Sequence, residues 1–290
     1  MGKKSRKTVP AEVIVPDGRD VAPDKKEPLL SVRGVDKSFG SRSRRTQVLF
    51  NVDMDVAEGE CLAVIGGSGS GKTTLTRIAF GLEQADSGTV TYRGVALSGV
   101  RSLGMLRLRN ESGLVFQNPF TSLDPRWTAG ESIAEGLIAR QAGHRAGDAG
   151  RRAASDDIAG AVRRALGMVG LDPDEFIGRY PVDMSGGQAQ RVAIARAIVA
   201  EPRIVLADEP MSAVDVSGRV QILDALAEIR RKRPRTAMVI VSHDLGVVQH
   251  IADRIVVLHD GRIEETAATS DLLTHPQSAY TKQLIDAAAW

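Results

Sequence analysis

The stretch CLAVIGGSGSGKTT, residues 61–74, decides the fold of this 290-residue chain. Its five leading apolar residues predict a fully buried strand, and KTTLTRIAFGL, which begins at Lys72, predicts a helix. The glycine-rich turn between them fits the pattern G-x-x-x-x-G-K-[ST], with Gly66, Gly71, Lys72 and Thr73 at the fixed positions. Backbone N–H groups without side chains can surround phosphate oxygens, and the lysine adds a positive charge. A flexible linker with an incidental lysine is the alternative, but the flanking strand and helix argue against it.

The composition is that of a globular protein, because 42% of the residues are hydrophobic and 26% are charged. A formal net charge of +2 is too small to indicate general affinity for nucleic acid or anionic membranes. No window approaches the roughly 18 consecutive apolar residues of a membrane span, so a membrane role requires a partner protein. Cys61 is the only cysteine, which rules out an internal disulfide and favours the reducing cytoplasm. Its apolar neighbours predict a buried small side chain rather than a reactive thiol.

The first two thirds of the chain contain strands and then a helical region. Residues 1–27 lack the apolar segment of a signal peptide, and we expect a disordered polar tail there. PLLSVRGVDKSF and QVLFNVDMDV predict two half-buried strands joined by the basic loop GSRSRRTQ, and GTVTYRGVAL predicts another strand. From about residue 118 to 184 the periodicity is helical, in ESIAEGLIARQAG and DDIAGAVRRALGMVGL, with a connector at 142–155. This region is expected to be an inserted helical subdomain.

After residue 186, short apolar runs alternate with helices again. RIVLAD and AMVIVS predict buried strands, and QAQRVAIARAIVA, SGRVQILDALAEIRRKR and LGVVQHIA predict helices. RIVVLHDGRIEE predicts a hairpin that turns at Asp260 and Gly261. Buried strands that alternate with helices indicate a parallel sheet. The predicted fold class is therefore α/β, with a parallel core sheet, an antiparallel β subdomain and the inserted α-helical subdomain.

A second polar element ends the predicted strand in IVLADEP, residues 204–210. It delivers Asp208 and Glu209 to the carboxyl end of a buried strand, where neighbouring side chains point in opposite directions. Asp208 suits Mg²⁺, directly or through water, and Glu209 suits the polarisation of an attacking water. Two acids can also end a strand in a solvated turn. Together with the phosphate loop, however, they indicate hydrolysis of a nucleoside triphosphate.

The pentapeptide MSGGQ, followed by AQRVAIARA, resembles the signature of ATP-binding cassette (ABC) proteins. Met184 stands where that family usually has leucine, which is a departure of similar volume. The resemblance covers roughly residues 28–288 and implies a P-loop NTPase fold of the ABC cassette type. In the family, the signature faces the γ-phosphate held by another subunit, so that two cassettes enclose two nucleotides.

The remaining cassette motifs follow in sequence order. Gln117 in LVFQNP resembles the Q-loop glutamine, which in the family reaches Mg²⁺ and the attacking water. SAVD, residues 212–215, resembles the D-loop of the dimer interface, with Val214 where leucine is more usual. His243 in IVSHD resembles the switch histidine that contacts the γ-phosphate, although a histidine after a strand can also be structural. Phe39 in VDKSFG resembles the aromatic that stacks on adenine, and a plain core role is the alternative.

The resemblance therefore implies hydrolysis of ATP with Mg²⁺ as the metal cofactor. The catalytic residues that it implies are Glu209, His243 and Gln117. The magnesium ligands that it implies are Thr73, Gln117 and Asp208. The implied nucleotide-binding residues are Phe39, Gly66, Ser68, Gly69, Ser70, Gly71, Lys72, Thr73, Thr74, Ser185, Gly186, Gly187, Gln188 and Asp215.

Two segments narrow the resemblance to one branch of the family. VFQNPFTSLDPRWTAGESIAEGL and HPQSAYTKQLIDA are similar to stretches in the ATPases of oligopeptide, dipeptide and nickel importers. Ser278 and Ala279 replace the usual His-Pro before the tyrosine of the second stretch, which belongs to a C-terminal family extension at about 266–288. Some members carry a C-terminal cysteine cluster, but with Cys61 alone no iron–sulfur cluster is predicted.

The function that this branch implies is an ATPase that energises an ABC importer of peptides or a related small solute, with nickel or a metal chelate as further candidates. Residues 118–127 are expected to contact the permease, and packing of the insert alone is the alternative. The implied partners are a second ABC ATPase subunit, expected to be a different chain, two transmembrane permease subunits and an extracytoplasmic substrate-binding protein. The expected location is peripheral, on the cytoplasmic face of the cell membrane.

Two other functions fit the same motifs. A cassette of this kind can serve as a soluble assembly factor of an enzyme complex such as carbon–phosphorus lyase. ABC proteins of translation or DNA repair carry two cassettes or long coiled coils, and neither pattern is visible here. The basic run RRKRPR, residues 230–235, fits a solvated helix end, where cations suit the helix dipole, so no nucleic-acid partner is predicted.

Overall fold

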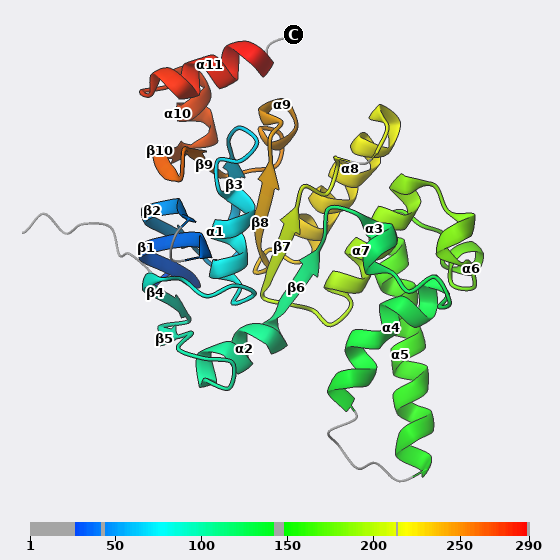
Figure 1. The fold of residues 1–290 in the computed structure, drawn as a ribbon. Helices are drawn as coiled ribbons and strands as arrows, with labels where there is room; N and C mark the ends of the chain where they lie inside the picture. The colour runs from blue at the N-terminus through cyan, green and yellow to red at the C-terminus, as the bar shows by residue number, and fades with distance from the viewer. Residues whose placement is uncertain (1–26, 42–43, 142–147, 213, 289–290) are drawn as a thin grey trace, which may run out of the picture.

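The computed structural model describes residues 27–41, 44–141, 148–212 and 214–288, so the predicted tail lies almost wholly outside the described residues. In the described part, the strands form a sheet of six, ordered β10-β9-β3-β8-β7-β6, and a sheet of four, ordered β2-β1-β4-β5. Figure 1 shows both sheets in the body of the molecule and the helices α3 to α6 to one side of them. This part contains no helix long and apolar enough to cross a membrane.

The strands are β1 (Leu30–Ser41), β2 (Arg44–Val56), β3 (Cys61–Ile65), β4 (Ser87–Tyr92), β5 (Val95–Ala96), β6 (Ser112–Val115), β7 (Ile204–Asp208), β8 (Ala237–Ser242), β9 (Arg254–His259) and β10 (Arg262–Ala268). The helices are α1 (Lys72–Ala79), α2 (Leu103–Glu111), α3 (Pro119–Ser122), α4 (Ala129–Gln141), α5 (Asp148–Met168), α6 (Pro173–Phe176), α7 (Gly186–Ile198), α8 (Val216–Lys232), α9 (Leu245–Val248), α10 (Thr269–Thr274) and α11 (Ala279–Ala288). A short 3-10 helix, η1 (Pro181–Asp183), precedes α7.

The larger sheet is parallel in its centre and buried on both faces. β3 pairs in parallel with β8 and β9, β7 pairs in parallel with β6 and β8, and β10 is antiparallel to β9. Cys61, Ala63 and Ile65 of β3 enter a core that also contains residues of α7 and α8. Leu62 and Val64 enter the opposite core, which contains residues of α1, β1 and β2. Burial of both faces explains why these strands are continuous apolar runs.

The burial of Cys61 agrees with the prediction from its apolar neighbours. Its side chain is fully buried, and burial raises the pKa of the Cys61 thiol to about 12. Because the thiolate is the reactive form, a thiol with such a pKa is inert at neutral pH. The predicted hairpin turn is also confirmed, since Asp260 (φ 44°) and Gly261 (φ 73°) join β9 and β10.

Two predictions for the smaller sheet are wrong in detail. The single strand predicted in GTVTYRGVAL is the hairpin of β4 and β5, because Arg93 (φ 50°) and Gly94 (φ 72°) turn the chain. The predicted loop GSRSRRTQ is largely strand, because β1 and β2 remain paired as far as Ser41 and Arg44. Continued pairing satisfies backbone groups that a wide loop would leave to solvent.

The helices α3 to α6 lie between β6 and α7, where the periodicity predicts helices. α5 begins at Asp148, inside the predicted connector at 142–155, because the alanines and arginines there favour helix. Residues 142–147 of that connector lie outside the described part. α9 is shorter than predicted, because the backbone after Val248 tightens into i→i+3 turns. The sequence pattern did not predict α2 or β6.

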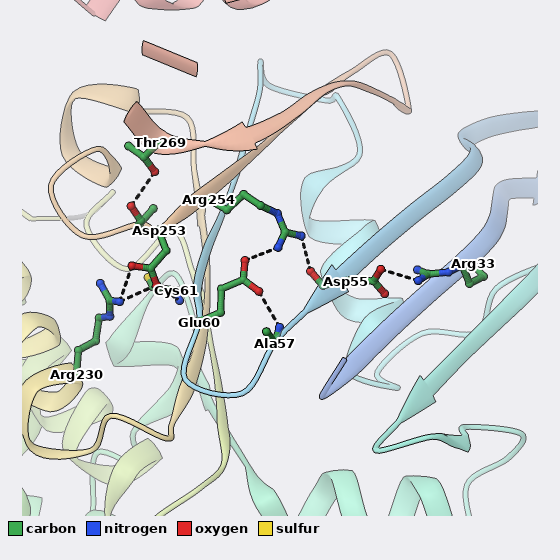
Figure 2. A network of polar contacts seen from close by, with 10 residues as sticks. Arg33, Asp55, Ala57, Glu60, Cys61, Arg230, Asp253, Arg254 and Thr269 are labelled. Carbon is green, nitrogen blue, oxygen red and sulfur yellow. Dashed lines mark hydrogen bonds and ion pairs between the residues drawn. The ribbon is translucent and has the colours of Figure 1, made fainter. Parts of the chain in front are cut away.

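Ion pairs join the elements at the amino ends of the central strands (Figure 2). Arg254 donates to the Glu60 carboxylate at 2.5 Å, and Arg230 contacts both oxygens of Asp253 at 2.7 and 2.8 Å. The Asp253 carboxylate also accepts the backbone N–H of Cys61 at 2.8 Å. The network links α8, β9 and the start of β3, and each of these carboxylates has a cationic partner.

Candidate nucleotide-binding site

The predicted catalytic residues converge at the carboxyl edge of the larger sheet. β3 leads into the glycine-rich loop, β7 ends at Asp208, β8 ends immediately before His243, and β6 ends two residues before Gln117. Because β6, β7 and β8 are adjacent and parallel, their carboxyl ends lie side by side. Ligands of open α/β sheets bind at this edge of the strands.

Two glycines of the loop are required by their surroundings. Gly66 has a φ of 153°, and a Cβ there would lie 2.0 Å from the carbonyl oxygen of Leu258. Gly71 has a φ of 101°, and a Cβ there would lie 2.9 Å from Leu49 Cδ2. The loop is therefore packed against β2 and β9 on one side, where a larger residue would displace it. Ser68 and Gly69 lie exposed at its rim.

Helix α1 begins directly after the loop and presents unpaired backbone N–H groups to it. Its first turn consists of Lys72, Thr73 and Thr74. These N–H groups have no carbonyl four residues earlier in the helix, and the turn contains no acidic side chain. The buried hydroxyl of Ser70 also has no hydrogen-bond partner among the described residues. A phosphate would accept bonds from such donors and would meet the positive end of the helix dipole.

Lys72 is buried beside the loop, with only 5% of its surface exposed. Its ammonium group donates to the carbonyl oxygens of Gly66 at 2.9 Å and Gly67 at 2.7 Å. Burial lowers the pKa of Lys72, while Glu209 and Asp208 act in the opposite direction. The neutral carbonyl oxygens of the loop thus hold the Lys72 ammonium group in place. A bound phosphate would replace these acceptors or add to them.

Thr73 and Asp208 provide a pair of oxygens of suitable spacing for Mg²⁺. Thr73 Oγ1 lies 3.4 Å from Asp208 Oδ1. Neighbouring ligands of an octahedral magnesium ion at about 2.1 Å lie about 3 Å apart, and opposite ligands about 4 Å apart. Burial and the adjacent Glu209 raise the pKa of Asp208, against the opposing effects of Thr73 and nearby cations. A bound cation would offset the cost of ionising Asp208 in this buried position, so the residues present fit the metal.

Glu209 has a strained backbone, and its carboxylate lies between the side chains of Gln117 and His243. Its φ of 45° is in the left-handed region, which costs a non-glycine residue on the order of 1 kcal/mol. Its N–H donates to the Val241 carbonyl at 3.0 Å, and its own carbonyl accepts from Ser212. Gln117 Nε2 donates to Glu209 Oε2 at 3.1 Å, and His243 Nδ1 lies 3.6 Å from Oε1. The amide and the imidazole therefore approach different oxygens of the Glu209 carboxylate.

Phe39 lies near the end of β1 and is 44% exposed, so the alternative of a plain core role is wrong. The Lys37 ammonium lies 4.9 Å from the centre of its ring, on one face. An exposed ring beside a cation is a suitable platform for a nucleobase.

The SGGQ segment and the D-loop pack on each other. Ser185 begins α7 with a capping box, in which its hydroxyl accepts the Gln188 N–H and its N–H donates to the Gln188 side chain. A Cβ on Gly187 would lie 3.2 Å from Val214 Cγ1, and Asp215 caps α8 by accepting the Gly218 N–H at 2.9 Å. Gly186 is the first residue of α7, and Ala213 of the predicted D-loop lies outside the described residues. In the described part of the chain, the hydrogen bonds of Ser185, Gly187 and Gln188 lie within α7 and its cap, away from the phosphate loop.

One residue at the loop was not among the predicted site residues. Tyr280 of α11 accepts a hydrogen bond from the Gly67 N–H at 2.8 Å. In the sequence, the C-terminal stretch is noted only for its similarity to importer ATPases. Nothing in its periodicity indicates that this stretch contacts the phosphate loop.

Taken together, the parallel sheet and its carboxyl edge define a P-loop protein that binds and hydrolyses a nucleoside triphosphate. The ABC transporter family matches residues 49–212, which is more than half of the chain. The chain belongs to the ABC transporter family, as an ATP-binding subunit.

Individual relatives agree over most of the sequence. A Brucella ovis protein named for peptide import and ATP binding is 42% identical over 90% of this chain and 78% of its own length. The oligopeptide transport ATP-binding protein OppF of Streptococcus mutans is 34% identical over 91% of this chain and 82% of its own length. The dimeric ATP-binding cassette MJ0796, solved with ADP and Pi, superposes with a TM-score of 0.68 at 30% identity, over 83% of this chain and 98% of that chain.

Proposed function

We propose that this chain hydrolyses Mg-ATP between two cassettes and thereby energises the import of peptides or a related small solute. The observation that carries the proposal is the convergence of Gln117, Glu209 and His243 beside the phosphate loop and the Thr73–Asp208 pair. Peptide and oligopeptide import stand in the names of the relatives described above, which supports this substrate class. Nickel or a metal chelate remains a secondary candidate.

The side chains divide the chemistry of hydrolysis among themselves. Lys72 and the N–H groups of the loop and of α1 bind the phosphates and stabilise the charge that develops on them. Glu209 accepts a proton from the attacking water, while Gln117 and His243 orient that water. Thr73, Asp208 and Gln117 would hold Mg²⁺, which neutralises phosphate charge when bound. Phe39 provides the face on which adenine stacks.

The SGGQ segment completes the site only in a dimer. In the proposed assembly, Ser185, Gly186, Gly187 and Gln188 at the start of α7 meet the γ-phosphate held by the other cassette. The helix start suits an anion, because the N–H groups of Gly186 and Gly187 have no carbonyl four residues earlier in the helix, whereas the Gln188 N–H is capped by Ser185. The dimeric state of the MJ0796 cassette supports this arrangement. We propose that the second cassette is a different chain.

Coupling to a permease is proposed to occur at the helical unit, residues 118–184. A groove of about 720 Å³ lies along α4 and α5, and it is lined by Trp127, Ile138, Ile158 and Val162 among others. Trp127 is 38% exposed and Ile138 is 53% exposed. Glu131 and Glu135 also line this groove, so a permease helix with apolar side chains and a basic residue would suit it.

The chain connects this groove to the ATP site directly. Gln117 is followed by α3, whose Ser122 carbonyl accepts from Arg196 of α7. Gln190 of α7 donates to the Phe116 carbonyl at 3.2 Å. Because α7 packs on α4 and α5, which line the groove, a shift of Gln117 on nucleotide binding would be transmitted to the groove through α7. We propose that the subunit binds two permease subunits and so lies at the cytoplasmic face of the membrane. The permease subunits would act with an extracytoplasmic binding protein.

The test combines turnover with the identification of partners. We expect the purified chain to hydrolyse ATP in the presence of Mg²⁺, and the tagged chain to co-purify with multi-span permeases from membranes of its host. Ile138→Asp should abolish co-purification, whereas Leu103→Asp, which changes an equally exposed apolar residue of α2, should not. A soluble enzyme complex without a membrane protein would contradict the importer and indicate an assembly factor.

A further inference from the structure

The C-terminal helix reaches the phosphate loop from the far end of the chain. Tyr280 Oη accepts the Gly67 N–H at 2.8 Å, across 213 positions of sequence. The ring of Tyr280 stacks on His259, with centroids 3.8 Å apart and an interplanar angle of 22°. Figure 1 shows α11 and α10 beside the end of the hairpin formed by β9 and β10. A tyrosine thus connects this hairpin to the loop.

The position of Tyr280 is fixed by a strand of the larger sheet. The Glu265 carboxylate of β10 accepts the N–H groups of Gln277 and Ser278, each at 3.0 Å. The Ser278 hydroxyl then accepts the Tyr280 N–H at 3.1 Å, which starts α11 at this point. Because three hydrogen bonds fix the segment before the ring, the hydroxyl is held in place at little further entropic cost.

The bond to Gly67 acts on the same peptide group that holds Lys72. The N–H of Gly67 and the carbonyl of Gly66 belong to one planar peptide unit. Its N–H donates to Tyr280, and its carbonyl accepts the Lys72 ammonium at 2.9 Å. Hydrogen bonds at the two ends of one peptide group polarise and strengthen each other. Rotation of this unit would therefore break both contacts at once.

We propose that Tyr280 is a positioning residue of the nucleotide site, which fixes the 66–67 peptide and through it the Lys72 ammonium. The C-terminal helix then contributes to phosphate binding through Tyr280. The inference rests on the proposed function in one respect, namely that the bound nucleotide is ATP. It predicts an effect on nucleotide affinity that is separable from the chemical step, because Tyr280 bonds to Gly67, whereas Glu209 contacts Gln117 and His243.

The first test removes the hydroxyl and keeps the ring. Tyr280→Phe should raise the Kd for ATP by about 3- to 10-fold, as expected for one net hydrogen bond, and leave kcat at saturating ATP within about twofold. Gln283→Ala, at an exposed position of the same helix, is the control and should leave Kd unchanged. Titration with a fluorescent ATP analogue measures Kd. A wild-type Kd in Tyr280→Phe would overturn the proposal.

The second test addresses the contact itself with a double-mutant cycle. A Cβ on Gly67 would lie 3.1 Å from Tyr280 Oη, which is closer than about nine in ten Cβ contacts in proteins. Gly67→Ala should therefore weaken ATP binding in the wild-type background and weaken it less in the Tyr280→Phe background. Strictly additive effects would mean that the two residues act independently, and would overturn the proposal.

A readout without nucleotide separates this inference from the proposed function. Hydrogen exchange of the Gly67 amide should be faster in Tyr280→Phe than in the wild type, in the absence of ATP. Equal exchange would overturn the role of Tyr280. A wild-type protein that binds ATP but never hydrolyses it would instead contradict the proposed function, while the Kd and exchange of Tyr280→Phe would still decide the role of the tyrosine.

Discussion

At the amino edge of the larger sheet, Arg254 and Glu60 lie 2.5 Å apart, whereas at the carboxyl edge Lys72 donates to neutral carbonyl oxygens. The amino edge pairs charges with each other across α8, β3 and β9 (Figure 2). At the carboxyl edge, the hydrogen bonds described above for Lys72 and Asp208 are to neutral groups, namely the carbonyl oxygens of Gly66 and Gly67 and the hydroxyl of Thr73. Burial lowers the pKa of Lys72 and raises the pKa of Asp208 there.

The difference separates charges that stabilise the fold from charges that serve a ligand. At the amino edge, each carboxylate already has a cation that favours its ionised form in the free protein. Asp208 and Lys72 instead bear a desolvation cost in the free protein, which a bound metal and nucleotide would remove. Perturbed titratable groups at a strand end are therefore evidence for a site, whereas the paired groups at the other edge are evidence for stability.

The largest expected effect tests the catalytic role of Glu209. Glu209→Gln should lower kcat by about 10²- to 10⁴-fold, because it removes the proton acceptor while keeping a hydrogen-bonding group beside Gln117 and His243. It should also trap an ATP-bound dimer, which gel filtration with ATP would detect. Glu60→Gln, at the amino edge, is the control and should retain turnover. Hydrolysis near the wild-type rate in Glu209→Gln would remove this residue from the mechanism.

The next effect concerns the charge that faces the phosphates. Lys72→Ala should weaken ATP binding by roughly 10- to 100-fold, because charged hydrogen bonds contribute about 1.5–3 kcal/mol. Equilibrium titration with ATP measures the change. Arg254→Ala removes a cation from the amino edge and should leave the affinity of the folded protein unchanged. Unaltered binding by the Lys72 variant would show that the loop backbone alone holds the phosphates.

At the amino edge, the expected effect is on stability rather than on activity. Asp253→Ala should lower the free energy of unfolding by about 1–3 kcal/mol, since it leaves the Cys61 N–H without its acceptor and removes the carboxylate partner of Arg230. Asp174→Ala breaks a surface pair in which Asp174 is 80% exposed, and should cost less than about 1 kcal/mol. Urea unfolding compares the two. Equal losses of unfolding free energy in the two variants would mean that the network at the amino edge contributes no more than exposed surface pairs do.

The sequence predicted the parts of the fold that depend on local pattern. β3, the phosphate loop and α1 are specified by an apolar run, glycines and a helical period within residues 61–79. β6 escaped prediction because it is only four residues long and contains Gly113, which packs so closely that a Cβ would lie 2.2 Å from the Ala197 carbonyl. Such a strand is defined by its neighbours rather than by its own pattern.

The same limit applies to the candidate site. The strand pattern predicted Glu209, and the family resemblance added Gln117 and His243. Neither predicted that the side chains of Gln117 and His243 approach different oxygens of the Glu209 carboxylate. The left-handed φ of Glu209 and the contact between Tyr280 and Gly67 depend on the assembled sheet. No periodicity encodes a hydrogen bond across 213 residues, so only the structure could reveal it.

The smallest expected effect comes from the cost of ionising Asp208 in the free protein. Burial and the adjacent Glu209 raise its pKa above that of the unfolded chain, so its ionised form destabilises the fold above that folded pKa. Asp208→Asn should therefore raise the Tm of the metal-free, nucleotide-free protein at pH 7–8 by roughly 1–3 °C. The gap should close as the pH falls below the unfolded pKa of about 4, where both forms are neutral. Thermal scans with a chelator measure it.

Addition of ATP and Mg²⁺ should reverse the order of the two proteins, because the wild type alone binds the metal through this carboxylate and is stabilised by its ligand. Asp174→Asn, at an exposed carboxylate, should change Tm little at any pH. A gap that does not vary with pH would mean that the charge of Asp208 carries no cost in the free protein. The carboxyl edge would then be as well balanced as the amino edge, and the contrast between them would no longer mark the site.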